Sequence, residues 1–381
     1  MKHKLLCLVL LITVFLTGCS GIGDVPHQRS EKAKKNGGDI LIGVAWPFAA
    51  KNGMLKEGVE MAASEINAAG GVLGRKIRLI EKDDESSVTK GMVIAQSFAE
   101  NLDVVAVIGH RSSYVSLPVA SIYENAGLLM LTPASTAPSL TQHEYKRVFR
   151  NIPSDEEIGK QMANYAAGKG LKRIVIFYAD DEYGRGLANS FEDKAGEHGI
   201  SLVDRLTYFG DDKQFNTNIE KWKLLGVDAI FVADVMPRAA NFISKVRQSG
   251  INVPILGGDG LESPDLWSIA AEKSEGVIVA SIFNPMYTRP EVQWFVQNYQ
   301  KKYGSLPSKW AAQGYDSVKL IAESMKKANS TDPDQIASVL RKLKDWPGVT
   351  GLHTFNEKGD VAGNLTVKKI MRSGNFEFLS D

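Results

Sequence analysis

Short apolar runs alternate with amphipathic stretches along most of the chain. The first four runs, each rich in β-branched residues or leucine, lie at 40–45, 77–82, 104–109 and 128–132. Runs of this length and composition are typical of buried strands. Between them, apolar residues recur on one helical face over 55–66, 88–99 and 115–123. Strand and helix in alternation predict a parallel sheet that is covered by helices on both faces.

The same alternation starts again after a predicted crossing at 151–153. Ser154, which three acidic residues follow, is typical of a helix N-terminus. The next five predicted strands lie at 173–178, 201–208, 229–234, 254–258 and 276–281. Beyond residue 285 the pattern is mainly helical, over 291–303, 310–327 and 334–343, and a last strand is predicted at 365–371.

The number of predicted strands bears on the domain organisation. One sheet with ten or more parallel strands would be unusual, and 381 residues are enough for two α/β domains of ordinary size. The pattern therefore predicts an α/β protein with two lobes. Periodicity alone leaves open which lobe the mainly helical third part joins.

The first segment of the chain predicts export. A short basic start precedes an apolar run over 5–16, which is too short for a permanent membrane span and is typical of a signal peptide. The run ends in the sequence LTGC, which resembles a bacterial lipobox. We predict a signal peptide over 1–18 and lipidation of Cys19; the alternative is an ordinary secretory signal that contains a cysteine. The polar stretch 20–38 is predicted to be a flexible linker behind this lipid anchor.

The number of cysteines and the net charge limit which compartment and which classes of partner are expected. Cys7 lies in the predicted signal peptide and Cys19 would carry the lipid, so no disulfide is expected in the mature chain. The formal charge is +1, and removal of Lys2 and Lys4 with the signal peptide lowers it to −1. This balance argues against nucleic acid as a partner. We expect a monomer in the periplasm or at the cell surface, held to the membrane by its lipid.

Motifs for catalysis and metal binding are missing from the sequence. No Gly-x-Gly-x-x-Gly follows the first strand, and no Walker loop, His-Glu-x-x-His or Gly-x-Ser-x-Gly occurs. Pairs of aspartates such as Asp83-Asp84 sit at strand ends without a third ligand nearby, and His110 is interpreted as structural. We therefore expect no enzyme activity, cofactor or metal. The alternative is an exported enzyme such as an amidase or phosphatase, which turnover of the bound molecule would reveal.

Six local sequences match a known family in order and spacing. They are EINAAGGVLG at 65–74, VIGHRSS at 107–113, TPAST at 132–136, DEYGRG at 181–186, GGDG at 257–260 and NEKGD at 356–360. Any one of these strings is a weak signal, whereas six in register are a strong one. Over about 39–371 the chain resembles the leucine/isoleucine/valine-binding proteins of ABC importers, which have the type I periplasmic binding fold.

The resemblance implies two Rossmann-like lobes joined by three crossing segments, with the ligand in the cleft between them. Lobe 1 would comprise 39–151 and 284–362, and lobe 2 would comprise 152–283 and 363–381. The implied function is that of a solute-binding lipoprotein that captures an amino acid, branched-chain or related, for ABC permease subunits. Two alternatives stay open: a carboxylate that is not an amino acid, such as an aromatic acid, and a ligand-sensing subunit of a membrane receptor.

A free amino acid is a zwitterion, so a site that buries it needs donors for the carboxylate and an acceptor for the ammonium. Ser113 follows a predicted strand and precedes a helix, where hydroxyl and backbone N–H groups can converge on an anion. By resemblance Ser113 donates to the carboxylate, and a plain helix cap is the alternative. Asp259 lies between glycines that let the backbone approach closely, and it would pair with the ammonium or be an ordinary turn residue.

Further site residues are implied by the resemblance. Ala134, Ser135 and Thr136 follow the strand at 128–132 and would contact the backbone atoms of the ligand. Tyr183 would cover the ligand from the second lobe when the cleft closes.

The positions that would hold the side chain of the ligand depart from the family pattern. Val235 and Asn52 stand where aromatic residues often line the pocket, and Trp46 lies a few residues before Asn52. Arg111 and Tyr114 flank the serine pair and either alter the pocket or line its rim. The set that recognises the amino-acid backbone is therefore intact, whereas the side-chain pocket is rebuilt. Which amino acid binds is open.

Overall fold

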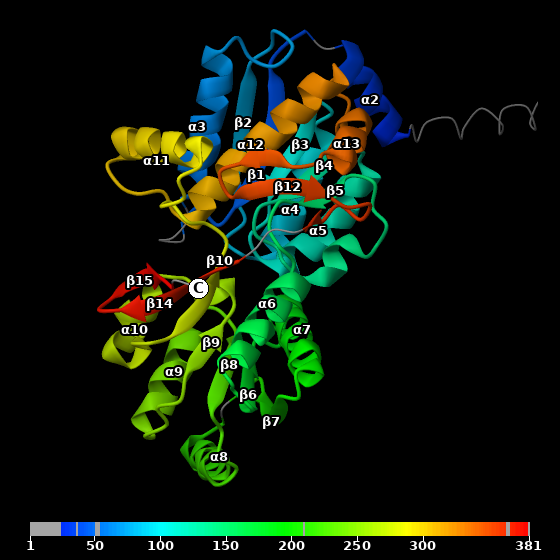
Figure 1. The fold of residues 1–381 in the computed structure, drawn as a ribbon. Helices are drawn as coiled ribbons and strands as arrows, with labels where there is room; N and C mark the ends of the chain where they lie inside the picture. The colour runs from blue at the N-terminus through cyan, green and yellow to red at the C-terminus, as the bar shows by residue number, and fades with distance from the viewer. Residues whose placement is uncertain (1–23, 36, 50–53, 209, 363–365, 380–381) are drawn as a thin grey trace, which may run out of the picture.

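Two sheets, each covered by helices on both faces, form the upper and the lower lobe in Figure 1. This computed structural model describes residues 24–35, 37–49, 54–208, 210–362 and 366–379. The predicted signal peptide, Cys19 and Asn52 lie outside these residues. Within the described ranges no helix is both long and apolar enough to cross a bilayer. The predicted α/β fold with parallel sheets is confirmed.

The upper lobe is built on a five-stranded parallel sheet in the order β2-β1-β3-β4-β5. Its strands are β1 (Ile40–Trp46), β2 (Ile77–Asp83), β3 (Val104–Gly109), β4 (Leu129–Thr132) and β5 (Val148–Arg150). All residues of β3 and all but one of β1 are buried, because apolar side chains project from both faces. The sequence pattern predicts four of these strands and misses β5, which has only three residues.

Helices cover both faces of the upper sheet. One face packs against α4 (Val88–Glu100) and α5 (Ser113–Asn125), and the other against α3 (Leu55–Ala68), α11 (Pro290–Tyr303), α12 (Lys309–Ala328) and α13 (Pro333–Lys342). The mainly helical third part of the chain thus packs on the first sheet. α3 and α12 lie so close that a Cβ on Gly58 would come within 2.0 Å of the Ala311 carbonyl oxygen, so glycine is required there.

The lower lobe contains a seven-stranded sheet in the order β15-β14-β10-β9-β8-β6-β7. Its strands are β6 (Arg173–Tyr178), β7 (Ser201–Leu206), β8 (Ala229–Ala233), β9 (Ile255–Gly257), β10 (Ile278–Ser281), β14 (Val367–Arg372) and β15 (Asn375–Phe378). The first five are parallel, whereas β14 and β15 add to the edge in antiparallel orientation. β15 was not predicted, because the sequence pattern gave only one strand, at 365–371, in the last part of the chain.

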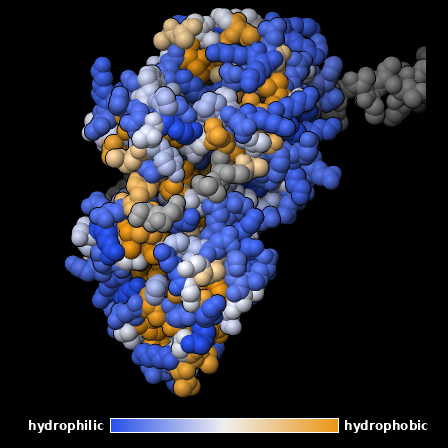
Figure 2. Space-filling model, in the orientation of Figure 1, coloured by the Kyte–Doolittle hydropathy of each residue, from blue (hydrophilic) through white to orange (hydrophobic). Residues whose placement is uncertain are grey.

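Five helices enclose the lower sheet. They are α6 (Asp155–Gly168) and α7 (Glu182–Glu197) on one face, with α8 (Asp212–Leu224), α9 (Arg238–Gln248) and α10 (Asp265–Ala270) on the other. Four buried apolar clusters result, one for each face of the two sheets. Figure 2 shows polar residues over much of the visible face of both lobes, interrupted by apolar residues, several of them on the lower lobe.

The chain passes between the two lobes three times. It leaves the upper sheet after β5, returns after β10, and leaves again before β14. Before the third passage it forms a small antiparallel sheet of β11 (Trp346–Gly348), β12 (Gly351–Phe355) and β13 (Val361–Ala362). These strands were not predicted, because two to five residues carry too little periodicity.

The stretch predicted to be a flexible linker is largely helical. α2 (Val25–Lys35) lies against the upper lobe (Figure 1), and Arg29 and Ala33 are buried. Arg29 donates hydrogen bonds to four backbone carbonyl oxygens near the ends of α4 and α5. The prediction of a flexible linker is therefore wrong for 25–35. A helix that docks through a buried arginine has no apolar stripe to reveal it.

Candidate ligand-binding site

A cavity of about 420 Å³ lies between the two lobes. The upper lobe lines it with the loops after β3 and β4 and the start of α12, and the lower lobe with the loops after β6, β8 and β9. Open α/β sheets place binding sites at such carboxyl ends of strands. The predicted residues that line the cavity are Ser113, Tyr114, Ala134, Tyr183, Val235 and Asp259.

Ser113 is the first residue of α5, at the end of the helix that faces the cavity. Ser112 is the N-cap residue, but its side chain makes no capping hydrogen bond. The Ser113 hydroxyl oxygen accepts a hydrogen bond from the backbone N–H of Ala137 at 3.3 Å, which leaves the hydroxyl proton for a ligand. The positive end of the α5 dipole lies at the same place. Hydroxyl and helix end together suit a carboxylate.

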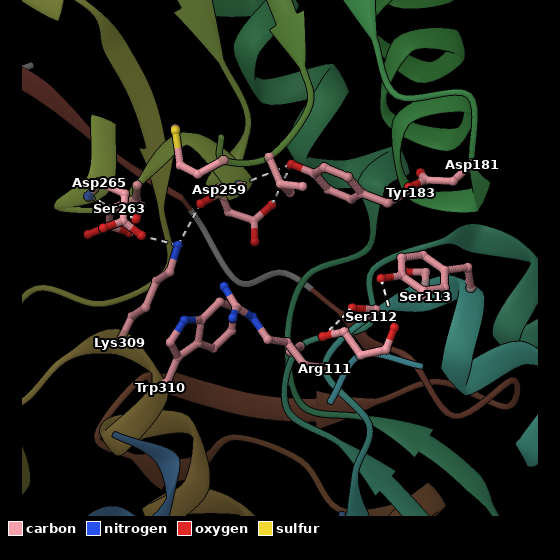
Figure 3. Close-up of a pocket in the computed structure, with 17 residues that line it drawn as sticks. Arg111, Ser112, Ser113, Asp181, Tyr183, Asp259, Ser263, Asp265, Lys309 and Trp310 are labelled. Atoms are coloured by element: carbon pink, nitrogen blue, oxygen red, sulfur yellow. Dashed lines mark hydrogen bonds and ion pairs between the residues drawn. The ribbon is translucent and has the colours of Figure 1, made fainter. Parts of the chain in front are cut away.

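Asp259 and Tyr183 form a polar pair on the lower lobe, facing the cavity in Figure 3. Tyr183 Oη donates to Asp259 Oδ1 at 3.3 Å and accepts from the backbone N–H of Gly260 at 3.0 Å. A Cβ at position 260 would lie 2.6 Å from Tyr183 Oη, so only glycine allows this approach. Burial raises the pKa of the Asp259 carboxyl, and the positive charge of Lys309 opposes this shift. A buried carboxylate in this setting is suited to a cationic group.

Three predicted residues are buried and are not part of the cavity lining. Ser135 donates to the carbonyl of His110 at 3.1 Å and so joins the loops that follow β3 and β4. The Thr136 carbonyl accepts from the first N–H of α6 at 2.8 Å. Trp46 is fully buried and packs edge-on against Trp310, with ring centroids 5.6 Å apart. In this structure these residues support the cavity wall rather than form its surface.

Lys309 is a cavity residue that sequence reasoning missed. It is the first residue of α12 in the upper lobe, and its Nζ donates to the Asp259 carbonyl at 2.5 Å across the cleft. The same Nζ lies 3.3 Å from Glu262, which also pairs with Lys369 at 2.5 Å. Burial alone would raise the pKa of Glu262, but the two lysines outweigh burial and lower it. Lys309 therefore bridges the lobes, and its place directly before the helix predicted at 310–327 was the only signal in the sequence.

Arg111 and Trp310 complete one end of the cavity. The Arg111 guanidinium carbon lies 5.7 Å from the centre of the Trp310 ring. Sequence reasoning placed Arg111 beside the serine pair without deciding between a pocket and a rim position, and the structure puts it in the cavity lining. Trp310 was predicted only as the first residue of a helix, because nothing local links it to a site some 200 residues earlier.

The cavity offers polar groups that can bind a small molecule. Among the described residues no group of three or more His, Cys, Asp or Glu side chains is placed to hold a metal ion. His110 is fully buried, with Nδ1 2.6 Å from Asp84 and Nε2 3.0 Å from the Tyr123 hydroxyl, so both ring nitrogens have partners. The groups that face the cavity include the Ser113 hydroxyl on one lobe and the Asp259 carboxylate on the other. Such a pair can hold a small molecule with both a negative and a positive group.

Two helix-covered sheets, three crossings and a polar cavity between the lobes define a two-lobed solute-binding protein of the type I periplasmic kind. A family model described as "Periplasmic binding protein" matches residues 41–374. The chain belongs to the periplasmic binding protein family.

Known relatives cover nearly the whole domain. The chain is 31% identical over 346 residues to the Leu/Ile/Val-binding protein homolog 2 of Brucella abortus (strain 2308), a match that spans 88% of this chain and 91% of that protein. It is 47% identical, with a TM-score of 0.83, to an ABC transporter substrate-binding protein of Desulfitobacterium hafniense in complex with Leu, over 90% of this chain and 100% of that one.

A third match is the branched-chain amino acid transporter substrate-binding protein LivJ of Streptococcus pneumoniae in complex with isoleucine. Its identity is 28% and its TM-score 0.78, over 89% of this chain and 98% of that one. These matches confirm the resemblance to leucine/isoleucine/valine-binding proteins that the six local sequences indicated.

Proposed function

We propose that this chain is an extracytoplasmic solute-binding lipoprotein that holds a free amino acid, branched-chain or related, for an ABC importer. The observation that carries the proposal is the pair formed across the cavity by Ser113, at a helix N-terminus, and Asp259, a buried carboxylate. A zwitterion placed between them gives each group a partner of opposite charge or polarity. The relatives that hold Leu and isoleucine support an amino acid as the ligand.

Each cavity residue has a proposed role. Ser113 donates to the carboxylate of the ligand, and Ala134 contributes its backbone. Asp259 accepts from the ammonium, while Tyr183 orients Asp259 and covers the ligand. Ser135 and Thr136 hold the loop after β4 that presents Ala134.

The proposed lobes comprise 39–151 with 284–362 and 152–283 with 363–381, and they close by hinge motion at the three connections. Lys309, which already bridges the lobes, is placed to stabilise the closed form. A lipid on Cys19 would hold the protein, as a monomer, at a membrane surface.

Calorimetric titration of the mature chain with the twenty amino acids and small carboxylates tests the proposal. Asp259→Asn removes the charge and keeps the shape. Loss of a buried charge partner weakens binding by about 2–5 kcal/mol, so affinity for the amino acid should fall roughly 30-fold or more.

Asp212→Asn is the matched control in the same lobe, because the Asp212 side chain is 91% exposed and far from the cavity lining. It should bind as the wild type does. If Asp259→Asn also binds as tightly as the wild type, the ligand has no ammonium at this position. The amino-acid assignment would then be wrong, and a plain carboxylate would replace it.

A further inference from the structure

The guanidinium of Arg111 is a charged group in the cavity. It has no role in the proposed recognition of the amino-acid backbone. In Figure 3 it lies beside Trp310, on the opposite side of the cavity from Ser113 and Tyr183. No hydrogen bond or ion pair joins the guanidinium to another residue in the part of the chain that the structure describes, and only the Arg111 backbone carbonyl accepts one, from Ser135. Its contacts are the Trp310 ring and the cavity itself.

Buried cations elsewhere in the described part of the chain have partners. Lys309 meets a carbonyl and Glu262, and Arg150 binds Asp360 together with two backbone carbonyls. Burial lowers the pKa of Arg111, and the charges of Asp259, Asp265 and Asp84 oppose this shift. No Arg111 nitrogen is among the buried polar atoms that lack a partner, so its N–H groups reach the cavity. A bound ligand that covered them with hydrocarbon would leave them without water and without an acceptor, which is unfavourable.

We propose that Arg111 determines specificity, by selecting amino acids whose side chain ends in a carboxylate over purely aliphatic ones. The inference rests on the proposed function and selects a related amino acid in place of a branched-chain one, since it takes the α-carboxylate to be at Ser113 and the ammonium at Asp259. The remaining part of the ligand then extends toward the Trp310 side of the cavity. There the planar fork of the guanidinium can bind a carboxylate with two parallel hydrogen bonds, while the Trp310 ring holds the guanidinium from the other side.

The departures seen in the sequence fit this assignment. Val235 is small and 43% exposed, so it does not form the aromatic wall that would enclose an aliphatic side chain. Ser86 and Ser263 add further polar groups to the lining. The lining therefore combines apolar side chains such as Trp310 and Met236 with these hydroxyls and the Arg111 charge, and an aliphatic ligand has no group to pair with that charge.

Calorimetry with L-glutamate and L-leucine tests the proposal. The wild type should bind L-glutamate at least about tenfold more tightly than L-leucine. Arg111→Leu should reverse that order, with the glutamate-to-leucine affinity ratio falling roughly 30-fold or more. Arg111→Gln, which keeps volume and polarity, should lower the ratio by a smaller factor. It also serves as the second variant should Arg111→Leu not fold. Arg78→Leu, an exposed arginine on β2 away from the cavity, is the control and should leave the ratio unchanged.

Two outcomes would overturn the assignment. One is a wild type that binds L-leucine as tightly as L-glutamate. The other is a variant at Arg111 that loses both ligands by the same factor, because the guanidinium would then bind the α-carboxylate that both share. Glutarate, which has two carboxylates and no ammonium, separates this proposal from the proposed function. If only glutarate binds, and Arg111→Leu abolishes it, the amino-acid function fails while the role of Arg111 stands.

Discussion

Replacement of Arg29 by methionine tests how the N-terminal helix α2 is held to the upper lobe. The Arg29 side chain is fully buried. Its nitrogens donate to the carbonyls of Ala126 at 2.9 Å, Asn101 at 2.7 Å, Ala99 at 2.6 Å and Val104 at 2.5 Å. Three of these carbonyls belong to the C-terminal ends of α4 and α5, where no helical partner is available and the helix dipole is negative. One guanidinium thus satisfies two helix ends.

The size of the effect follows from this geometry. A hydrogen bond to a charged group contributes roughly 1.5–3 kcal/mol to the free energy of unfolding. The sum over four such bonds is larger than the free energy with which α2 docks on the upper lobe. α2 has 11 residues and lies near the chain terminus, so it can detach and return water to the carbonyls. Detachment limits the loss to the free energy of docking α2. Burial lowers the pKa of Arg29 to about 10, which shows a desolvation penalty that reduces the net gain. We expect Arg29→Met to lower the free energy of unfolding by about 2–4 kcal/mol.

Urea denaturation of the mature chain and hydrogen exchange of the α2 amides measure the two consequences. Lys32→Met is the control on the same helix, because Lys32 is 45% exposed and its ion pair with Asp103 is worth less than about 1 kcal/mol. α2 amides should exchange faster in Arg29→Met and not in the control. If Arg29→Met unfolds within about 0.5 kcal/mol of the wild type with unchanged α2 exchange, the guanidinium does not dock the helix.

Three further predictions concern anchoring, closure and pH. Cys19→Ser should leave the protein unprocessed or release it from the membrane fraction, and lipid labelling of this variant would contradict the lipobox. A saturating ligand should reduce the radius of gyration in small-angle scattering, so an unchanged radius would count against hinge closure. Burial, together with the charge of Asp259, raises the pKa of Asp155 well above its usual range. The native state then holds that proton more tightly than the unfolded state, and ionised Asp155 destabilises the fold at neutral pH. Asp155→Asn should therefore be about 1–3 kcal/mol more stable than the wild type near pH 8, in a gap that narrows as the pH falls toward 5.

The sequence by itself determined the elements whose pattern is long and periodic. β1 and β3 are continuous apolar runs, and α3 and α4 carry apolar faces. The sequence of each segment therefore predicts which of its residues are buried. The family followed from six short sequences in register. The segments that the sequence pattern did not predict are of two kinds. Some are short, such as β5 and β11 to β13, and α2 is held by contacts other than apolar packing. A periodic pattern predicts the burial of apolar side chains, but it does not predict a helix that is docked by one arginine.

Only the tertiary structure decided what surrounds the cavity. Ser113 and Asp259 could be proposed because each follows a predicted strand, and strand ends in such a fold meet at one edge. Lys309 could not, because it follows no strand and its partners Asp259 and Glu262 belong to the other lobe. In the same way, only the packing of the described segments shows that none of their residues is a hydrogen-bond or ion-pair partner of the Arg111 guanidinium. Local sequence sets which residues are buried, whereas the packing of two lobes made from distant segments sets which charges meet.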